Sequence, residues 1–394
     1  MTPMQRFANF VERNFEFSSP SSISLLQKYR NSIYPKELHN FQLQHLLYMK
    51  LSLCLLILFF AGCKSIDKKP SESIVARGQM PAITRDKEND LHLTYGSGDS
   101  IMYASSIDGG STFTSSSLIA VVPKLAASHT RGPQIAATSA GLVLTACDVF
   151  GNIYSFVKPT AATWRESARV NDVDTVAKEN LMALSADGNL AFAVWLDLRD
   201  KHNKIFGSGS TDGGITWSKN IMIYASPDTT VCECCKPSVV VNGNNVNIMF
   251  RNWLDGNRDL YLIQSSDGGN SFGVAKKLGK GSWPLKGCPM DGGSLTVTDN
   301  DVQTVWNRKG KIYTAVPGKE ETEIGEGRGC TMETLDGKNV YAWVINGEVV
   351  LLKPGGVKEV LGKGQSPVLK AIDDNHLICV WENEKNIHKV VVKL

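Results

Sequence analysis

Short hydrophobic stretches with alternating polar positions recur from about residue 80 to the C-terminus. Val246-Asn247-Ile248-Met249-Phe250 is one of them, and such alternation is typical of a half-buried strand. Most of these stretches end in or near an aromatic residue: Tyr95, Trp195, Trp253, Trp306, Trp343 and Trp381. Few segments have the period of an amphipathic helix, so the pattern predicts an all-β protein.

The strands fall into repeating units that begin at similar short segments. Counting these starts gives seven, at Pro81, Pro133, Leu181, Pro237, Pro289, Thr331 and Pro367. A period of about 40–50 residues with four short strands per unit is the signature of a β-propeller. The last unit, 367–394, has room for only three strands, so we expect residues 73–77 to supply the fourth and close the ring. The prediction is a β-propeller of four-stranded blades, seven by this count, with six as the alternative.

Three segments share a Ser-X-Asp-Gly-Gly pattern that ends in an aromatic residue. They are residues 106–113, 210–217 and 265–272. Their aspartates, Asp108, Asp212 and Asp267, are 104 and 55 positions apart, so one intervening unit has lost the pattern. Asp-Gly supplies the positive-φ residues of a hairpin turn, and the carboxylate can accept backbone N–H bonds within it. We therefore expect each segment to be a tight structural turn.

These three segments resemble the Asp-box (BNR) repeats of sialidase-like β-propellers. The fold resemblance covers nearly all of residues 72–394. It implies that each box lies between the third and fourth strands of a blade, on the face away from the ligand. It also implies a protein that acts on or binds glycans, as an exo-α-sialidase-like glycoside hydrolase does.

The chain departs from the sialidase pattern in its catalytic residues. Arg77-Gly78-Gln79-Met80-Pro81 stands where sialidases have Arg-Ile-Pro. Sialidases also need a Tyr nucleophile activated by a Glu, with a separate Asp as acid/base. Tyr341 belongs to a second-strand pattern, so we expect it in the core. Two functions stay open: a sialidase-like hydrolase, and a non-catalytic envelope propeller that binds a glycan, a protein or a Cys-liganded metal.

Charged residues concentrate in the loops that we place on the face opposite the boxes. The candidate catalytic residues are Asp197, Asp255 and Asp291. The candidate ligand-binding residues are Arg131, Glu179, Arg199, Arg258 and Arg328. Converging guanidinium groups hold a carboxylate through paired hydrogen bonds, and the resemblance implies three such arginines for a sialic acid carboxylate. Arg251 and Arg308 compete for that role, and a salt-bridged β-turn is the alternative at Asp197 and Asp255.

Four cysteines form a second candidate site. Cys232, Cys234 and Cys235 precede the fourth unit and Cys288 opens the fifth. We expect a disulfide from the first cluster to Cys288. A copper or zinc site, with Met290 or His129 nearby, and a redox role are the alternatives. Apart from such a metal, no cofactor is expected. Cys147 and Cys379 lie in second-strand patterns, where buried apolar thiols are expected.

The N-terminal region has the pattern of a targeting signal. An apolar run from Leu51 to Phe60 follows Lys50 and ends in Ala61-Gly62-Cys63. The run is too short to span a bilayer and suits a signal peptide. Its end resembles the lipobox of bacterial lipoproteins, which implies lipidation of Cys63. The expected organisation is an upstream segment 1–48 from an early start or a disordered arm, a signal peptide 49–62, a lipidated tether 63–72, and a propeller 73–394.

Composition limits the remaining possibilities. The net charge is +3 with 21% charged residues, and no basic stripe indicates nucleic-acid binding. A hydrophobic content of 42% excludes wholesale disorder. We expect an exported monomer, held by its lipid to the outer membrane or the periplasmic side of the cell envelope, with a carboxylate-bearing sugar as its ligand.

Overall fold

The computed structural model describes residues 72–298 and 301–394. The predictions made for residues 1–71, including lipidation of Cys63, lie outside the described residues. Within the described part of the chain, no helix is long and apolar enough to cross a membrane.

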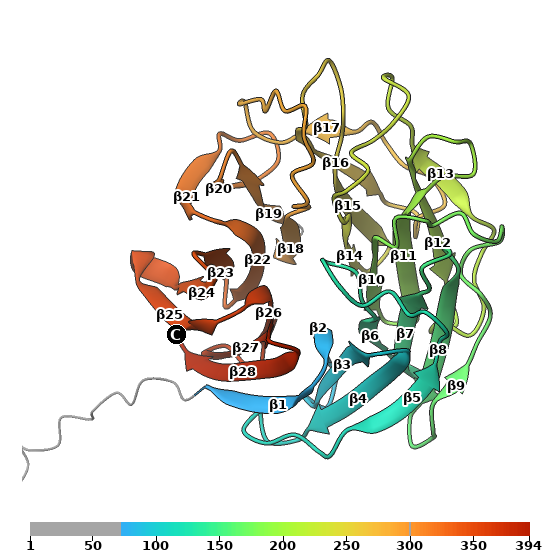
Figure 1. The fold of residues 1–394 in the computed structure, drawn as a ribbon, viewed down its shortest axis with the longest axis vertical. Coiled ribbons are helices and arrows are strands. Elements are labelled where there is room, and N and C mark those ends of the chain that lie inside the picture. Colours follow the sequence, from blue (N-terminus) through green and yellow to red (C-terminus); the bar gives the residue numbers. More distant parts are fainter. Residues whose placement is uncertain (1–71, 299–300) are drawn as a thin grey trace, which may run out of the picture. The chain divides into compact units, whose positions relative to one another are not determined.

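Seven sheets of four antiparallel strands form a ring, which confirms the predicted seven-bladed propeller (Figure 1). The first blade contains β2 (Gln79–Arg85), β3 (Leu91–Ser97), β4 (Ser100–Ser106) and β5 (Ser117–Val121). The second contains β6 (Gln134–Thr138), β7 (Gly141–Cys147), β8 (Ile153–Pro159) and β9 (Arg165–Glu166). The third contains β10 (Met182–Asp187), β11 (Leu190–Asp197), β12 (Lys204–Ser210) and β13 (Ile221–Tyr224).

The next three blades repeat this arrangement. The fourth contains β14 (Ser238–Asn242), β15 (Asn245–Arg251), β16 (Leu260–Ser265) and β17 (Lys276–Lys277). The fifth contains β18 (Ser294–Thr298), β19 (Asp301–Arg308), β20 (Lys311–Ala315) and β21 (Thr322–Glu326). The sixth contains β22 (Arg328–Leu335), β23 (Lys338–Ile345), β24 (Glu348–Leu352) and β25 (Lys358–Lys363), with a short 3₁₀ turn, η1 (Pro354–Gly356), before β25.

The seventh blade joins the two ends of the described chain. It contains β26 (Gln365–Ala371), β27 (His376–Asn383) and β28 (Asn386–Lys393) from the C-terminus. Its outer strand is β1 (Ser73–Arg77), which pairs with β28 from Ser73↔Lys389 to Arg77↔Asn386. The strand predicted to close the ring is therefore confirmed, with the predicted bounds.

The second strand of each blade forms most of the core because neighbouring blades cover both of its faces. Trp195, Trp306, Trp343 and Trp381 lie in four of these strands and are almost completely buried. Cys147 and Cys379 are buried as predicted. Burial raises the pKa of Cys147 to about 12 and also raises that of Cys379, so both stay protonated thiols.

The three Asp-Gly-Gly turns connect the third and fourth strands of their blades. In the third blade, the Asp212 carboxylate accepts the backbone N–H groups of Ile215 and Thr216 at 3.0 and 2.9 Å, and the Thr216 hydroxyl at 2.6 Å. Burial raises the pKa of Asp212, but these hydrogen bonds outweigh it and lower the pKa. Trp217, which closes the turn, packs against the core. The expected turn geometry is confirmed.

The turns determine which face is left for a ligand. Gly213 and Gly268 donate backbone hydrogen bonds to Asn189 and Asn244, which lie in the first-to-second strand hairpins of the same blades. Those hairpins and the Asp-Gly-Gly turns therefore share one face of the ring. The opposite face carries the second-to-third strand loops and the segments that lead into each blade. We refer to it as the loop face.

Replacing Asp212 with alanine is expected to destabilise the fold by about 1–3 kcal/mol, because turn N–H groups lose their acceptor. Chemical denaturation of the two proteins measures this difference. Ligand binding by the folded variant should stay unchanged, since the turn lies opposite the loop face. A loss of binding at unchanged stability would show that the ligand lies on the same face as the Asp212 turn.

Candidate functional site

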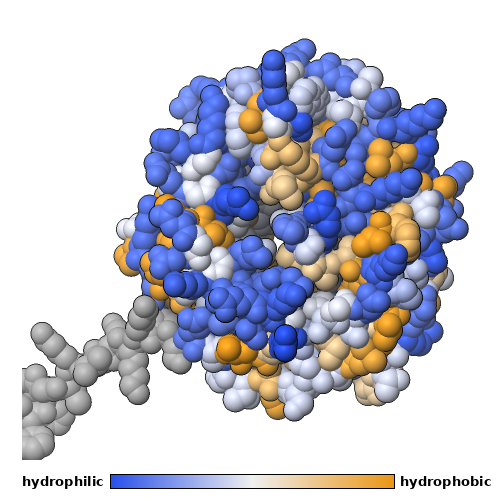
Figure 2. Space-filling model, in the orientation of Figure 1, coloured by the Kyte–Doolittle hydropathy of each residue, from blue (hydrophilic) through white to orange (hydrophobic). Residues whose placement is uncertain are grey.

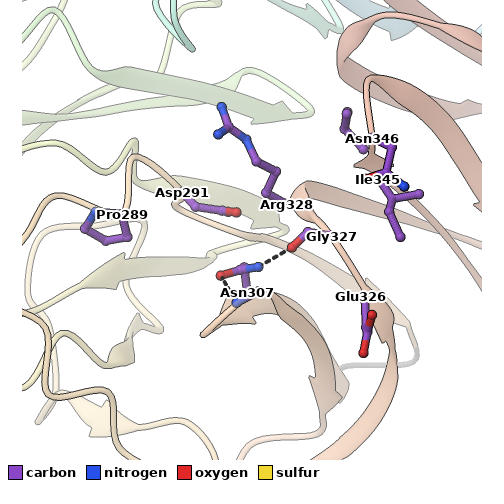
Figure 3. A pocket seen from close by; sticks show the side chains of 10 residues that line it. Pro289, Asp291, Asn307, Glu326, Gly327, Arg328, Ile345 and Asn346 are labelled. Carbon is purple, nitrogen blue, oxygen red and sulfur yellow. Dashed lines mark hydrogen bonds between the residues drawn. The ribbon is translucent and has the colours of Figure 1, made fainter.

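An open cavity of about 510 Å³ lies on the loop face between the fifth and sixth blades (Figure 3). Four segments form it: the one leading into β18, the β19–β20 turn, the β21–β22 junction and the β23–β24 turn. Its lining residues are Pro289, Asp291, Asn307, Gly310, Glu326, Gly327, Arg328, Val344, Ile345 and Asn346. Amide, carboxylate and guanidinium groups therefore surround one opening.

Asp291 is the buried acidic group of this cavity. Its side chain accepts a hydrogen bond from the backbone N–H of Gly329 at 2.8 Å, and the residue is only 4% exposed. Burial raises its pKa, against the opposing effects of Arg251 and Arg328. The glycines that follow are required by packing, since a Cβ on Gly292 would meet the Lys236 carbonyl and Gly293 has a φ of 75°. The Asp-Gly-Gly sequence here thus positions a functional group close to the backbone of the fourth blade.

Arg328 is the positively charged residue that lines the cavity. Its side chain makes no hydrogen bond or ion pair with any described residue, and the residue is exposed. Figure 3 shows its guanidinium pointing away from Asn307 and Glu326. A guanidinium with its donors unpaired at the edge of a cavity can accept a carboxylate through two parallel hydrogen bonds.

Arg251, an alternative candidate for binding the ligand carboxylate, has a structural role. It is 1% exposed, and its donors reach three backbone carbonyls. Nε bonds Asp291 at 3.0 Å, Nη1 bonds Arg258 at 2.7 Å and Nη2 bonds Asn307 at 2.9 Å. Arg251 therefore ties the loop of Asp291 to the fourth and fifth blades.

The Asp197–Arg199 loop adopts the salt-bridged turn given as the alternative. Asp197 accepts the backbone N–H of Arg199 and its Nε, each at 2.9 Å, and the indole of Trp195 at 2.8 Å. The Arg199 guanidinium also lies 4.2 Å from the centre of the Phe206 ring. Arg199 also pairs with Asp172, in the segment that leads into the third blade, at 3.2 Å. Neither charged group lines the cavity.

The other predicted residues are dispersed over the loop face. Arg131 donates from Nε to the Glu179 carbonyl at 2.7 Å, which joins the second and third blades. Burial raises the pKa of Glu179. Asp255 is exposed, with a φ of 50°, and Arg258 stacks on Trp253 at 4.1 Å. Of the predicted site residues that the structure describes, only Asp291 and Arg328 line the cavity.

Three polar lining residues were missed in the sequence: Asn307, Glu326 and Asn346. The Asn307 amide donates to the Gly327 carbonyl, while Glu326 and Asn346 are exposed. Asn346 has a φ of 52°, and Asn-Gly at 346–347 is a turn signal that places it on the loop face. Nothing in the linear sequence brings these residues together, because they come from separate strands of two blades.

The cysteine cluster contains the expected disulfide, between Cys234 and Cys288, with their Cα atoms 6.2 Å apart. Cys232 and Cys235 keep free thiols, 3.4 Å apart between sulfur atoms. The sulfur atoms of Cys232, Cys234 and Cys235 lie within 4.8 Å of one another, a spacing that could hold a metal ion. One of the three is already bonded to Cys288, which leaves two thiols as ligands.

Comparisons with known proteins support the fold and go no further. No protein-family model matches the chain, and no curated protein matches it. The BP39L lectin from Burkholderia pseudomallei superposes with a TM-score of 0.58 at 10% identity, over 82% of this chain and 97% of that chain. BBS1N, from its complex with ARL6DN, superposes with a TM-score of 0.52 at 10% identity, over 83% of this chain and 96% of that chain. At such identities the likeness shows a shared β-propeller fold.

The NanB sialidase from Streptococcus pneumoniae superposes less well. Its TM-score is 0.43 at 11% identity, over 83% of this chain and 70% of that chain.

Proposed function

We propose that this protein is an exported, lipid-anchored propeller that binds a carboxylate-bearing sugar in the cavity between its fifth and sixth blades. Two groups that line this cavity carry the proposal: the Arg328 guanidinium, which has no partner among the described residues, and the buried carboxyl of Asp291. Small polar ligands are held in such cavities by a few polar groups that converge on one opening. The face shown in Figure 2 is hollowed at its centre, and mostly hydrophilic residues surround the hollow.

The chemistry of the lining suits a sugar acid. Arg328 supplies a cation for the carboxylate. Asn307 and Asn346 supply amide groups, which both donate to and accept from hydroxyls. Val344 and Ile345 add apolar surface for the carbon skeleton of the ring. The resemblance to Asp-box propellers supports the same ligand class.

Binding, rather than sialidase-type hydrolysis, is the proposed activity. Asp291 has a pKa raised by burial, as a group that protonates a leaving oxygen requires. However, no tyrosine is among the described residues that line the cavity. Tyr341 is buried in β23, with its hydroxyl 3.0 Å from that of Thr314, so it is not placed to act as a nucleophile. Release of fluorophore from a fluorogenic sialoside would add hydrolysis to the proposal, with Asp291→Asn as the inactive variant.

Replacing Arg328 with alanine is expected to weaken binding of N-acetylneuraminic acid at least tenfold, because the carboxylate loses a charge-assisted contact of about 1.5–3 kcal/mol. The melting temperature should change little, since Arg328 is exposed and unpaired. Isothermal titration calorimetry of both proteins measures the difference. Arg165→Ala, a matched change of an exposed arginine on the outer strand β9, should leave binding unchanged. No heat from the wild type would remove the proposed function.

Export and lipidation rest on the N-terminal signal and are supported by the disulfide. Disulfides persist in oxidising compartments and are rare in the cytosol. Cys63→Ser is expected to release the protein from the membrane fraction, because it removes the lipid attachment point. Intact mass of the exported protein should show a chain that begins at a lipidated Cys63. A mature protein that retains residues 1–48 would contradict this part of the proposal.

A further inference from the structure

Four cysteines on the loop face form a series that runs from solvent into the core. Cys288 is exposed and is bonded to Cys234, which is partly buried. Cys232 and Cys235 are 0% and 1% exposed. The Cys232 sulfur lies 3.8 Å from that of Cys234 and 3.4 Å from that of Cys235. A disulfide with one end in solvent thus contacts a buried dithiol at its other end.

The two buried thiols have opposite environments. The Cys232 sulfur accepts a hydrogen bond from Nη1 of Arg258 at 3.0 Å. The Cys235 contact and the charges of Arg258 and Arg251 lower the pKa of Cys232 to about 6, against the effect of burial. Burial raises the pKa of Cys235, whose sulfur accepts the Asp291 N–H at 3.4 Å. The guanidinium contact favours the thiolate, which is the nucleophilic form, at Cys232.

We propose that these residues form a thiol–disulfide relay, with Cys232 and Cys235 as its inner half and the Cys234–Cys288 bridge as its outer half. In the first step, the Cys232 thiolate attacks the Cys234 sulfur. A Cys232–Cys234 bond forms, the Cys234–Cys288 bond breaks, and Cys288 leaves as a thiolate at the surface. In the second step, Cys235 attacks the Cys232 sulfur, and its proton passes to the departing Cys234.

The relay conserves electrons without any outside reactant. It begins with a Cys234–Cys288 disulfide and a buried dithiol, and it ends with a buried Cys232–Cys235 disulfide and a dithiol that reaches the surface at Cys288. That outer dithiol can reduce a disulfide-bearing compound in solvent: one disulfide of the compound is cleaved to two thiols and the Cys234–Cys288 bond reforms. The net result is transfer of two electrons from the buried dithiol to the external disulfide.

Trapping the released thiol tests the relay. The native full-length protein is incubated with N-ethylmaleimide and denatured, and its labels and disulfides are assigned by peptide mass. We expect Cys288 to become labelled with time, while a new bridge forms within the 232–235 segment. Cys235→Ser blocks only the second step, so it should accumulate a Cys232–Cys234 bridge with labelled Cys288. Cys232→Ser should slow labelling of Cys288 at least tenfold.

A matched control separates the relay from general loosening of the fold. Cys379→Ala removes a buried thiol in β27, on the seventh blade, and should leave labelling of Cys288 unchanged. Label on Cys232 while the Cys234–Cys288 bridge is intact would overturn the relay. So would equal labelling of Cys288 in Cys232→Ser, no labelling of Cys288 in the wild type, or a stoichiometric metal ion held by Cys232 and Cys235. If Cys232→Ser fails to fold, Cys235→Ser still tests the first step: a Cys232–Cys234 bridge supports the relay, and its absence overturns it.

Discussion

A chain that begins at Gly78, and therefore lacks β1, is expected to lose about 4–6 kcal/mol of folding free energy relative to one that begins at Glu72. β1 pairs with β28 along its length, and each backbone hydrogen bond contributes about 1 kcal/mol. Val75 and Ala76 also pack against the core beside Ile387, which adds about 1–2 kcal/mol. Since the free energy of unfolding of a domain is only about 5–15 kcal/mol, this loss is a large fraction of the stability of the whole propeller.

Urea denaturation of the two truncated proteins measures the loss. The shorter protein should also aggregate, because β28 becomes an uncovered edge strand. Adding a synthetic peptide of residues 72–78 should recover part of the lost stability, whereas a peptide of the same composition in scrambled order should not. Equal stability of the two proteins would contradict closure of the seventh blade by β1.

Replacing Cys288 or Cys234 with serine is expected to destabilise the protein by about 2–4 kcal/mol. The disulfide joins residues 54 positions apart, and cross-linking a loop of this length restricts the unfolded chain by roughly that free energy. The bridge also holds the segment leading into the fifth blade, which carries Asp291, against the fourth blade. Thermal and denaturant unfolding of the single and double variants measure the effect.

The two cysteine substitutions should not be additive, because each removes the same bond. The double variant should therefore be about as stable as either single variant. A thiol reductant should lower the stability of the wild type by a similar amount and leave the variants unchanged. Additive losses, or a wild type that is insensitive to reductant, would contradict a bond between these two residues.

The fold could be predicted because its determinants are local and repeated. Asp-Gly-Gly turns, alternating strands and buried second-strand aromatics each depend on a few neighbouring residues, and their period sets the number of blades. The closing strand was predictable for a different reason. The last unit lacked a strand, and residues 73–77 were the only remaining segment next to the first unit. Each of these inferences needs spacing alone, without knowledge of which side chains meet.

The site was only partly predictable because it depends on contacts between blades. Arg251, Arg258 and Arg328 look equivalent in the sequence, yet their partners differ. Arg251 donates to three backbone carbonyls. Arg258 is stacked on Trp253 and hydrogen-bonded to Cys232. Arg328 has no partner among the described residues. Which arginine remains available depends on the conformation of neighbouring loops. The spacing of residues along one chain does not determine that conformation.

The disulfide could be predicted less fully than the fold but more fully than the cavity. The sequence placed Cys288 and the 232–235 segment at the starts of adjacent blades, where the propeller brings them close. It did not distinguish Cys232, Cys234 and Cys235, which differ by one or two positions. The choice of Cys234 follows from side-chain direction, because Cys232 and Cys235 point into the core while Cys234 lies nearer the surface.

A crystal structure of the protein grown with N-acetylneuraminic acid tests the central claim most directly. The account predicts one sugar in the cavity between the fifth and sixth blades. Its carboxylate should form two hydrogen bonds with Arg328, and its hydroxyls should contact Asp291, Asn307 or Asn346. A sugar bound on the face that carries the Asp212 and Asp267 turns would contradict it. So would a sugar with its carboxylate against Arg199 or Arg131.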